Sequence, residues 1–543
     1  MVSKLWKNYN STHAYDGYFT KDNKLRKHAT IISSILERYG KKKLQEIEKN
    51  CQSTISARGI NFRVYAANNR AEEKKWPLDI IPRIIPKTQW NKVSKGLKQR
   101  VKALNLFIDD AYNQKKIFKD KIIPREIIFN SPFYVKECEG FSPKHKAWSN
   151  ISGVDLIRNT NGDYLVLEDN LRVPSGVSYM LENRMVMRDV FPELFTRYKV
   201  ASIHQYTNKL YNCMVECIPK KTVNPHMVVL TPGIFNSAYF EHSFLAEQMG
   251  IALVEGKDLF VENDIVYMKT VKGPLKVDCI PKKTSNPHMV VLTPGVYNSA
   301  YFEHSFLAEQ MGVALVEGKD LFVENDIVYM KTVKGPLKVD CIYRRLDDNF
   351  LDPKVFFKGS LIGVPGLFKS WRKGNVGIIN AIGTGVADDK VVYSYVNKMI
   401  VYYLGEQPIL NQVETYLCHN KNERNYVIEN ISKLVVKPAN ASGGYGIMIG
   451  PKADKKERDE VIAKIKKKPR EYIAQPLETL STAPTITEND IEPRHLDLRP
   501  FVLSGKTTYV STGGLTRVAL RKGSTIVNSS QGGGSKDTLI VDV

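Results

Sequence analysis

The 543-residue sequence lacks the long hydrophobic runs that would place it in a membrane or send it out of the cell. The first residues, Met1 to Tyr9, contain no apolar core of a signal peptide. No later stretch approaches the roughly 18 consecutive apolar residues that a membrane span needs. No segment is rich enough in Pro, Gly and Ser to separate independent modules. We therefore expect a cytoplasmic protein with no membrane partner.

Cysteine is also scarce, with seven scattered residues and no Cys-x-x-Cys pair. This spacing argues against a zinc ribbon, and the low density argues against a secreted disulfide scaffold. We expect reduced thiols. The remaining composition, 43% hydrophobic and 25% charged, is ordinary for a globular protein, and the length allows two to four domains.

Acidic residues are outnumbered by basic ones, 57 against 79, which gives a formal charge of +22. A clustered basic face would indicate nucleic-acid binding. The lysine runs at 41–43, 455–456 and 466–468 instead lie in charge-mixed, helix-like segments without interleaved aromatic residues. We therefore expect no nucleic-acid partner, although a basic field favours the approach of anionic substrates.

A glycine-rich turn follows an apolar strand that ends in Lys437 and Pro438. The backbone N–H groups of such a turn can hold an anion while the lysine neutralises its charge, so the segment predicts a phosphate-binding loop. It is not a Walker A loop, because no Gly-Lys-Ser/Thr follows. A hairpin turn that needs positive φ is the alternative. The predicted phosphate-binding residues are Lys437, Ser442, Gly443, Gly444, Tyr445 and Gly446.

Two alternating runs, 151–158 and 164–170, predict a β-hairpin with a turn at 159–162. Glu168 and Asn170 are two residues apart and share a face, which Asp155 on the partner strand can reach. Carboxylate and amide oxygens suit Mg²⁺ that bridges nucleotide phosphates, so Asp155, Glu168 and Asn170 are the predicted metal ligands. Alternatively, Asp169 and Asn170 begin a turn.

Two arginines, Arg499 in Asp497-Leu498-Arg499 and Arg517 in Leu515-Thr516-Arg517, are candidate catalytic residues. A guanidinium fork suits a transferring phosphoryl group or a tetrahedral oxyanion. Of the two, Arg517 is favoured. Either arginine is alternatively a buried structural ion pair, with Asp497 as the expected partner of Arg499.

An internal repeat occupies the middle of the chain. Residues 217–278 recur as 279–340 with 58 of 62 positions identical, which indicates a recent tandem duplication or an error in gene assembly rather than a solenoid. Each copy predicts a strand, a turn, a helix, a strand and a short hairpin. Polar residues at the strand–helix turn are candidates for substrate contact or helix capping: Asn298, Tyr301, Glu303 and His304, with Asn236, Tyr239, Glu241 and His242 in the first copy.

The exits of the two copies differ. The second copy continues into Cys341-Ile342-Tyr343, whereas the first continues into Cys279-Ile280-Pro281, where the proline interrupts a strand. We therefore expect the second copy in the native sheet and the first as an appended subdomain.

Together these segments resemble the circularly permuted ATP-grasp type 2 family, related in chemistry to glutathionylspermidine synthase and other carboxylate–amine ligases. The resemblance covers nearly the whole chain, and the metal strands precede the phosphate loop, the reverse of ordinary ATP-grasp enzymes. It implies a mixed α/β (α+β) fold with a Rossmann-like layer that carries the duplication. The segments that carry the resemblance are 81–85, 167–178, 292–302, 383–390, 435–446, 497–503 and 528–537.

The organisation implied is residues 1–200 for a helical region with the metal hairpin, 201–400 for the Rossmann-like layer, and 401–543 for the ATP-binding part. The resemblance also implies ATP and Mg²⁺, a second ATP lysine at Lys390, and an adenine hinge at Ala474 and Gln475. Alternatively, Lys390 is a surface lysine, and Ala474 and Gln475 belong to an ordinary sheet strand. A glycine loop at 532–534 is expected to close over the site.

The activity implied is ligation of small-molecule or peptide carboxylates to amines through an acyl phosphate. The alternatives are a phosphotransferase with another acceptor and an inactive scaffold damaged by the duplication. The sequence names no protein partner.

Overall fold

The computed structural model describes most of the chain outside the first copy of the repeat. For residues 61–65, 71–74 and the strands between 229 and 277 it describes the backbone alone. The described ranges are 5–10, 14–65, 71–218, 229–231, 253–255, 259–262, 265–268, 275–277, 288–295, 298, 300–332, 335–441, 446–487, 490–525, 527 and 533–543.

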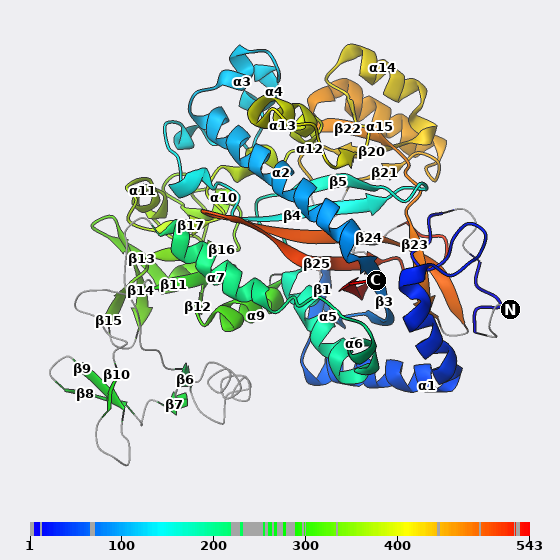
Figure 1. Cartoon of the computed structure of the whole chain (residues 1–543). Helices are drawn as coiled ribbons and strands as arrows, with labels where there is room; N and C mark the ends of the chain where they lie inside the picture. Colours follow the sequence, from blue (N-terminus) through cyan, green and yellow to red (C-terminus); the bar gives the residue numbers. More distant parts are fainter. Residues whose placement is uncertain are drawn as a thin grey trace.

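A mixed eight-stranded sheet forms the centre of the molecule (Figure 1). Its order is β18-β5-β4-β24-β25-β26-β3, with β23 paired to β24. The outer pairs β18–β5 and β26–β3 are parallel, and the inner pairs are antiparallel. Its strands are β3 (Leu78–Pro86), β4 (Ile151–Arg158), β5 (Tyr164–Asn170), β18 (Asn411–Gln412), β23 (Thr482–Ile486), β24 (Ile491–Ser504), β25 (Thr508–Val518) and β26 (Gly534–Val541).

Strands β4 and β5 form the hairpin expected from the alternating pattern. The Asn159 side chain accepts backbone hydrogen bonds from Asn161 and Asp163 at 3.0 and 2.9 Å, which fixes the turn. Asp155 lies directly opposite Glu168, and the register shifts after Asp155. The hairpin thus brings both carboxylates to one place on the sheet.

The sequence pattern predicts helices over 23–39 and 90–117, and both are present with different ends. Helix α1 (Thr30–Ala57) begins later than expected and continues past a break at Gly40, where φ is 64°. Helix α2 (Lys87–Tyr112) stops before Asn113, and the chain resumes as α3 (Lys116–Lys119) after the left-handed Lys115. The other helices of this half are α4 (Arg125–Phe129), α5 (Val177–Val190), α6 (Glu193–Arg197) and α7 (Gln205–Cys217).

A smaller antiparallel sheet, β19-β22-β20-β21, lies with α14 and α15 near the β5 side of the central sheet (Figure 1). Helix α15 is capped by Asp454, which accepts from Glu457 N, and its last turn carries three lysines that suit the negative end of the helix dipole. The elements are β19 (Tyr416–Leu417), β20 (Leu434–Pro438), β21 (Met448–Ile449), β22 (Tyr472–Pro476), α12 (Lys390–Tyr393), α13 (Val396–Leu404), α14 (Lys421–Glu429) and α15 (Lys455–Lys467).

The second copy of the repeat supplies two strands, β11 and β12, of a four-stranded parallel sheet with the order β12-β11-β16-β17. Helix α9 (Tyr301–Met311) connects β11 to β12, and an antiparallel sheet, β13-β14-β15, follows. The elements are β11 (Met289–Leu292), β12 (Ala314–Val316), β13 (Leu321–Glu324), β14 (Ile327–Thr332), β15 (Gly335–Lys338), β16 (Cys341–Arg344), α10 (Asp348–Leu351), α11 (Leu367–Arg372) and β17 (Gly377–Ile379).

The described strands of the first copy form two small sheets of their own, drawn at the lower left of Figure 1. They are β6 (Val229–Thr231), β7 (Leu253–Glu255), β8 (Leu259–Glu262), β9 (Ile265–Met268) and β10 (Leu275–Val277). The exit of this copy at Pro281, like most of its residues, lies outside the described ranges. One further pair, β1 (Asn61–Tyr65) and β2 (Ala71–Lys75), lies near the N-terminus. Within the described ranges, no helix has the length and apolar character of a membrane span.

Candidate active site

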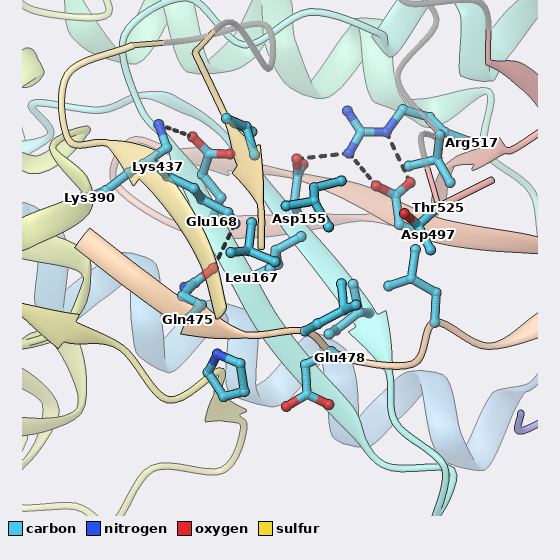
Figure 2. Close-up of a pocket in the computed structure, with 18 of the residues that line it drawn as sticks. Asp155, Leu167, Glu168, Lys390, Lys437, Gln475, Glu478, Asp497, Arg517 and Thr525 are labelled. Atoms are coloured by element: carbon cyan, nitrogen blue, oxygen red, sulfur yellow. Dashed lines mark hydrogen bonds and ion pairs between the residues drawn. The ribbon is translucent and has the colours of Figure 1, made fainter. Parts of the chain in front are cut away.

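A cavity of about 290 Å³ lies where the central sheet faces the smaller sheet. Strands β4, β5, β24 and β25 contribute from one side, and β20, β21 and β22 from the other (Figure 2). It brings together eight of the residues predicted from the sequence: Asp155, Glu168, Asn170, Lys390, Lys437, Gln475, Arg499 and Arg517.

The carboxylate of Asp155 is held by both candidate arginines. Arg499 donates Nε and Nη2 to its two oxygens at 2.5 and 2.8 Å, and Arg517 donates Nη2 at 2.8 Å. Burial alone would raise the pKa of Asp155, but the two guanidiniums outweigh it and hold the pKa well below its usual range. Asp155 is therefore ionised at neutral pH.

The expected pairing of Asp497 with Arg499 is wrong. Asp497 lies opposite Arg517 in the β24–β25 ladder, and Arg517 donates Nε to it at 2.9 Å as well as a second bond through Nη2. Arg499 lies opposite Leu515 and reaches across to Asp155 on β4 instead. Both arginines line the cavity, and both are ion-paired. Arg517 bridges the carboxylates of Asp155 and Asp497 (Figure 2).

Two lysines from distant segments meet at the other end of the cavity. Lys390 pairs with Glu168 at 2.8 Å and donates to the Ala441 carbonyl at 2.6 Å. Lys437 donates to Gln475 Oε1 at 2.6 Å. Burial and the nearby Lys390 lower the pKa of Lys437 to about 8, although Glu168 opposes the shift. Lys390 is 9% exposed, so the reading of a surface lysine is wrong.

The glycine-rich turn after β20 is described only at its two ends. Ser442, Gly443, Gly444 and Tyr445 lie outside the described residues. Gly446 has a φ of 73°, and a Cβ there would approach Pro438 Cγ to 3.0 Å. The end of the turn therefore requires glycine for both its conformation and its packing.

The two hinge candidates differ in position. Ala474 is fully buried and does not line the cavity, and it pairs with Tyr416 on one side and Val436 on the other. Gln475 lines the cavity, bridging Lys437 and the Thr415 hydroxyl, to which it donates at 3.0 Å. The chain then leaves the sheet while still lining the cavity through Pro476, Leu477 and Glu478.

The predicted metal ligands fit a hard cation in part. Among the described residues, no group of three or more His, Cys, Asp or Glu lies close enough to hold a metal ion. Asn170 Nδ2 is buried without a hydrogen-bond partner, and one Glu168 oxygen is taken by Lys390. Both oxygens of Asp155 are engaged by arginines. The carboxylate of Glu168 and the side-chain oxygen of Asn170, not its Nδ2, are the groups that suit Mg²⁺.

Asp169, between these two ligands, faces the opposite side of β5. It is buried and accepts Arg100 Nη2 at 2.6 Å. Because successive residues of a strand face opposite sides of the sheet, Asp169 is a structural carboxylate while Glu168 lines the cavity.

Sequence reasoning missed several cavity residues. Glu478, Thr525 and Val527 follow strands or lie in loops without a pattern of their own, and Asp497 was assigned only a structural role. Burial, together with the nearby Glu414, raises the pKa of Glu478. The cavity lining thus holds four acidic and four basic side chains: Asp155, Glu168, Glu478 and Asp497 with Lys390, Lys437, Arg499 and Arg517.

None of the described residues in the strand–helix turn of the second copy lines this cavity. Glu303 is fully buried and accepts the backbone N–H groups of Gly176 and Val177 at 2.7 and 2.8 Å. His304 contacts the Thr293 hydroxyl at 2.9 Å. Glu303 therefore braces the start of α5, and His304 braces the chain directly after β11.

Comparison with known proteins gives a consistent family. The profile of the circularly permuted ATP-grasp type 2 family matches residues 82–286 and 279–519. An uncharacterized Synechocystis protein is 43% identical over 534 residues, 98% of each chain. An uncharacterized Mycobacterium tuberculosis protein is 44% identical over 484 residues, 89% of this chain and 76% of its own length.

Two further matches carry functional names. A putative glutamate–cysteine ligase of Frankia casuarinae is 36% identical over 541 residues, and this chain spans 55% of its length. The solved structure of a glutathione synthetase-like effector from Globodera pallida aligns with a TM-score of 0.50 at 10% identity, covering 92% of this chain and 97% of that one. At this identity the structural match concerns the fold alone.

Proposed function

The chain belongs to the circularly permuted ATP-grasp type 2 family, and we propose that it is an ATP- and Mg²⁺-dependent carboxylate–amine ligase. The family confirms the resemblance read from the motifs. A relative named putative glutamate–cysteine ligase supports C–N bond formation. The substrates proposed are a small-molecule or peptide carboxylate and an amine.

One observation carries the proposal: two lysines and two arginines from four separate segments line a single cavity. A nucleotide triphosphate and a substrate carboxylate are both anionic, and directed cationic donors in a partly buried site bind such groups strongly. Lys390 and Lys437 lie at the end that meets the glycine-rich turn, where the phosphates would bind. Arg499 and Arg517 lie at the other end, where the carboxylate would meet the terminal phosphoryl group.

The adenine would occupy the apolar part of the same cavity. Val435, Ile447, Ile449 and Leu477 line it from the smaller sheet and the segment after β22. Since Ala474 is paired on both edges, the backbone from Gln475 to Glu478 is the better position for the hinge. This proposal keeps Gln475 as an adenine contact and replaces Ala474 with residues 476–478.

Glu168 and Asn170 would hold Mg²⁺, with Asp155 joining them only if its arginines move. When bound, the ion would neutralise phosphate charge and stabilise the transferring phosphoryl group. Asn170 would bind the ion through its side-chain oxygen, whereas its unpartnered Nδ2 is a donor that suits a phosphate oxygen.

The proposed reaction has two steps. A substrate carboxylate oxygen attacks the γ-phosphorus of ATP, the bond to the bridging oxygen breaks, and ADP leaves with an acyl phosphate remaining. An amine then attacks the acyl carbon, loses a proton, and expels inorganic phosphate to leave an amide. Arg499 and Arg517 would orient the carboxylate and stabilise the charge that develops on the phosphoryl oxygens and the tetrahedral oxyanion.

We further propose that β12-β11-β16-β17 is the Rossmann-like layer expected for this family and that the 62-residue repeat is a tandem duplication within it. No residue of either copy lines the cavity among the described residues. The duplication is therefore compatible with an intact site, which favours an enzyme over an inactive scaffold.

The test is product formation from ATP, Mg²⁺ and pools of carboxylic acids and amines, followed by mass spectrometry. A ligase yields ADP, phosphate and a new amide in equal amounts, and Lys437→Met yields none. A phosphorylated product without an amide would favour a phosphotransferase. A folded protein that neither binds nor consumes ATP would favour the scaffold.

A further inference from the structure

The two copies of the repeat form the same internal strand pairs. Val229 pairs with Leu253 in the first copy, as Val291 pairs with Leu315 in the second. The antiparallel ladders of β8-β9-β10 and β13-β14-β15 also share one register, shifted by 62 residues. Both copies therefore form the same local strand pairings, although only the second lies within the parallel sheet.

The place occupied by the second copy is a specific one. Its strand β11 pairs in parallel with β16, beginning at Met289 opposite Cys341. Glu303 accepts hydrogen bonds from Gly176 and Val177 at the start of α5. The Phe302 ring stacks on Tyr179 with centroids 5.6 Å apart. We call this place, bounded by β16 and the start of α5, the sheet position.

Every residue that makes these contacts has an identical counterpart in the first copy. Met227, Phe240 and Glu241 correspond to Met289, Phe302 and Glu303. The copies differ at four positions only: Val223/Ser285, Ile234/Val296, Phe235/Tyr297 and Ile251/Val313. The contacts that hold the second copy in the sheet position are therefore available to the first.

Chain connectivity permits the replacement. His288 and Asp340, near the start and end of the second copy, exchange hydrogen bonds of 2.9 and 2.7 Å. Since the unit begins and ends at one point, a second copy can be looped out there without displacing the flanking elements. The chain outside the sheet position runs from 219 to 287 with the second copy in place, and would run from 279 to 340 with the first. Loops of such similar length have nearly equal closure entropy.

The copy outside the sheet position lacks a neighbour that the other has. Strand β11 pairs with both β12 and β16, whereas β6 pairs only with β7 among the described strands. The segment after the first copy cannot replace β16, because Pro281 stands where Tyr343 stands and has no N–H to donate. The edge of β6 that has no partner among the described strands therefore matches β16 and not its own continuation.

We propose that the two copies compete for the sheet position, so that the protein exists as two isomers, each with one copy in the parallel sheet and the other looped out. The active-site cavity is the same in both isomers, because its described lining residues lie outside the repeat. Two of the differences, Ile234/Val296 and Ile251/Val313, each add one methylene to the first copy, and each changes an equilibrium constant by about fourfold when fully buried. Both isomers are therefore populated.

Hydrogen exchange on the unmodified full chain tests this directly. Peptides spanning residues 251 and 313 differ in mass by the single methylene, so mass spectrometry follows each copy separately. Competition predicts a slow and a fast population in each peptide, with the slow fractions adding to one. If the copies interchange faster than the amides are labelled, each peptide exchanges as a single population, at a rate between the slow and fast rates that is weighted by the two occupancies. A peptide around 313 that is wholly slow, beside one around 251 that is wholly fast, would overturn the proposal.

Paired substitutions provide a second test. Glu303→Ala disables the second copy in the sheet position, and Glu241→Ala disables the first. Competition predicts that either single change lowers the folding equilibrium constant by about tenfold or less, because the other copy takes over, whereas the double change lowers it far more than the product of both. A single Glu303→Ala as damaging as the double, with Glu241→Ala silent, would overturn it. Detection by light scattering of a dimer in which two chains exchange copies would also overturn the proposal.

Discussion

Arg499 holds Asp155 through two parallel hydrogen bonds of 2.5 and 2.8 Å, from β24 to β4 of the central sheet. The sequence pattern predicted that the Asp155 carboxylate would bind a metal ion, whereas in the structure it pairs with a guanidinium. With Arg517 on the same oxygen pair, the carboxylate is neutralised before any ligand binds. The site thus presents Glu168 and Asn170 to a cation and keeps Asp155 as the anchor of two arginines.

Removing the charge of Asp155 is expected to destabilise the protein. Asp155→Asn leaves the buried Arg517 and the partly buried Arg499 with less compensation, and breaking a buried pair in this way costs about 3–5 kcal/mol. Equilibrium denaturation measures the loss. The control is Asp542→Asn, whose pair with Lys87 is half exposed, with an expected change within about 0.5 kcal/mol. Equal effects of the two substitutions would contradict the buried-cluster account.

Lys437→Met is expected to stabilise the unliganded protein while abolishing ATP binding. The folded pKa of about 8 lies below that of an unfolded lysine, so the unfolded state binds more protons between these values. Below pH 8 the buried lysine therefore lowers the free energy of unfolding by an amount on the order of 1–3 kcal/mol. This destabilisation becomes smaller as the pH rises towards 10. Thermal unfolding with and without ATP checks both effects.

Lys433→Met is the matched control, because Lys433 is exposed four residues earlier. It should change neither the melting temperature nor the ATP-induced shift. A lower melting temperature for Lys437→Met than for this control would show that the Lys437 cation stabilises the fold instead of binding a ligand.

ATP affinity is expected to fall as pH rises through about 8, since only the protonated form of Lys437 neutralises a phosphate. Above pH 8, Lys437 is deprotonated in the free protein but still protonated when ATP is bound. In that range the dissociation constant for ATP rises by up to about tenfold per pH unit. Titration calorimetry at pH 7 and pH 9 measures this change. A wild-type dissociation constant that is flat over this range would contradict a phosphate contact by Lys437.

Glu168→Gln is expected to remove most of the magnesium dependence of ATP binding. The amide keeps the size of the side chain but offers a weaker ligand and no negative charge, so magnesium-dependent affinity should fall by about tenfold or more. Titrations with and without Mg²⁺ give the two constants. Asp163→Asn, in the exposed turn of the same hairpin, should leave both unchanged. Retained magnesium dependence in Glu168→Gln would remove Glu168 from the metal site.

The sequence predicted those site features that depend on local pattern. The alternation of β4 and β5 placed Glu168 and Asn170 on one face, and the strand that ends at Lys437 lies where it was expected. The partner of Asp497 was wrong because it depends on the register between β24 and β25, which neighbouring residues do not encode. Glu478 and Thr525 were missed because only tertiary packing brings them to the cavity.

Magnesium-dependent ATP binding is the most direct test of the account, measured by thermal shift on the wild-type chain, Glu168→Gln and Lys437→Met. ATP at ~100 times its dissociation constant should add about 2.7 kcal/mol to the stability of the wild type in the presence of Mg²⁺. The account predicts that this gain requires Mg²⁺ and is lost in Lys437→Met, with most of the magnesium effect lost in Glu168→Gln. A folded wild-type protein that shows no shift with ATP and Mg²⁺ would contradict it.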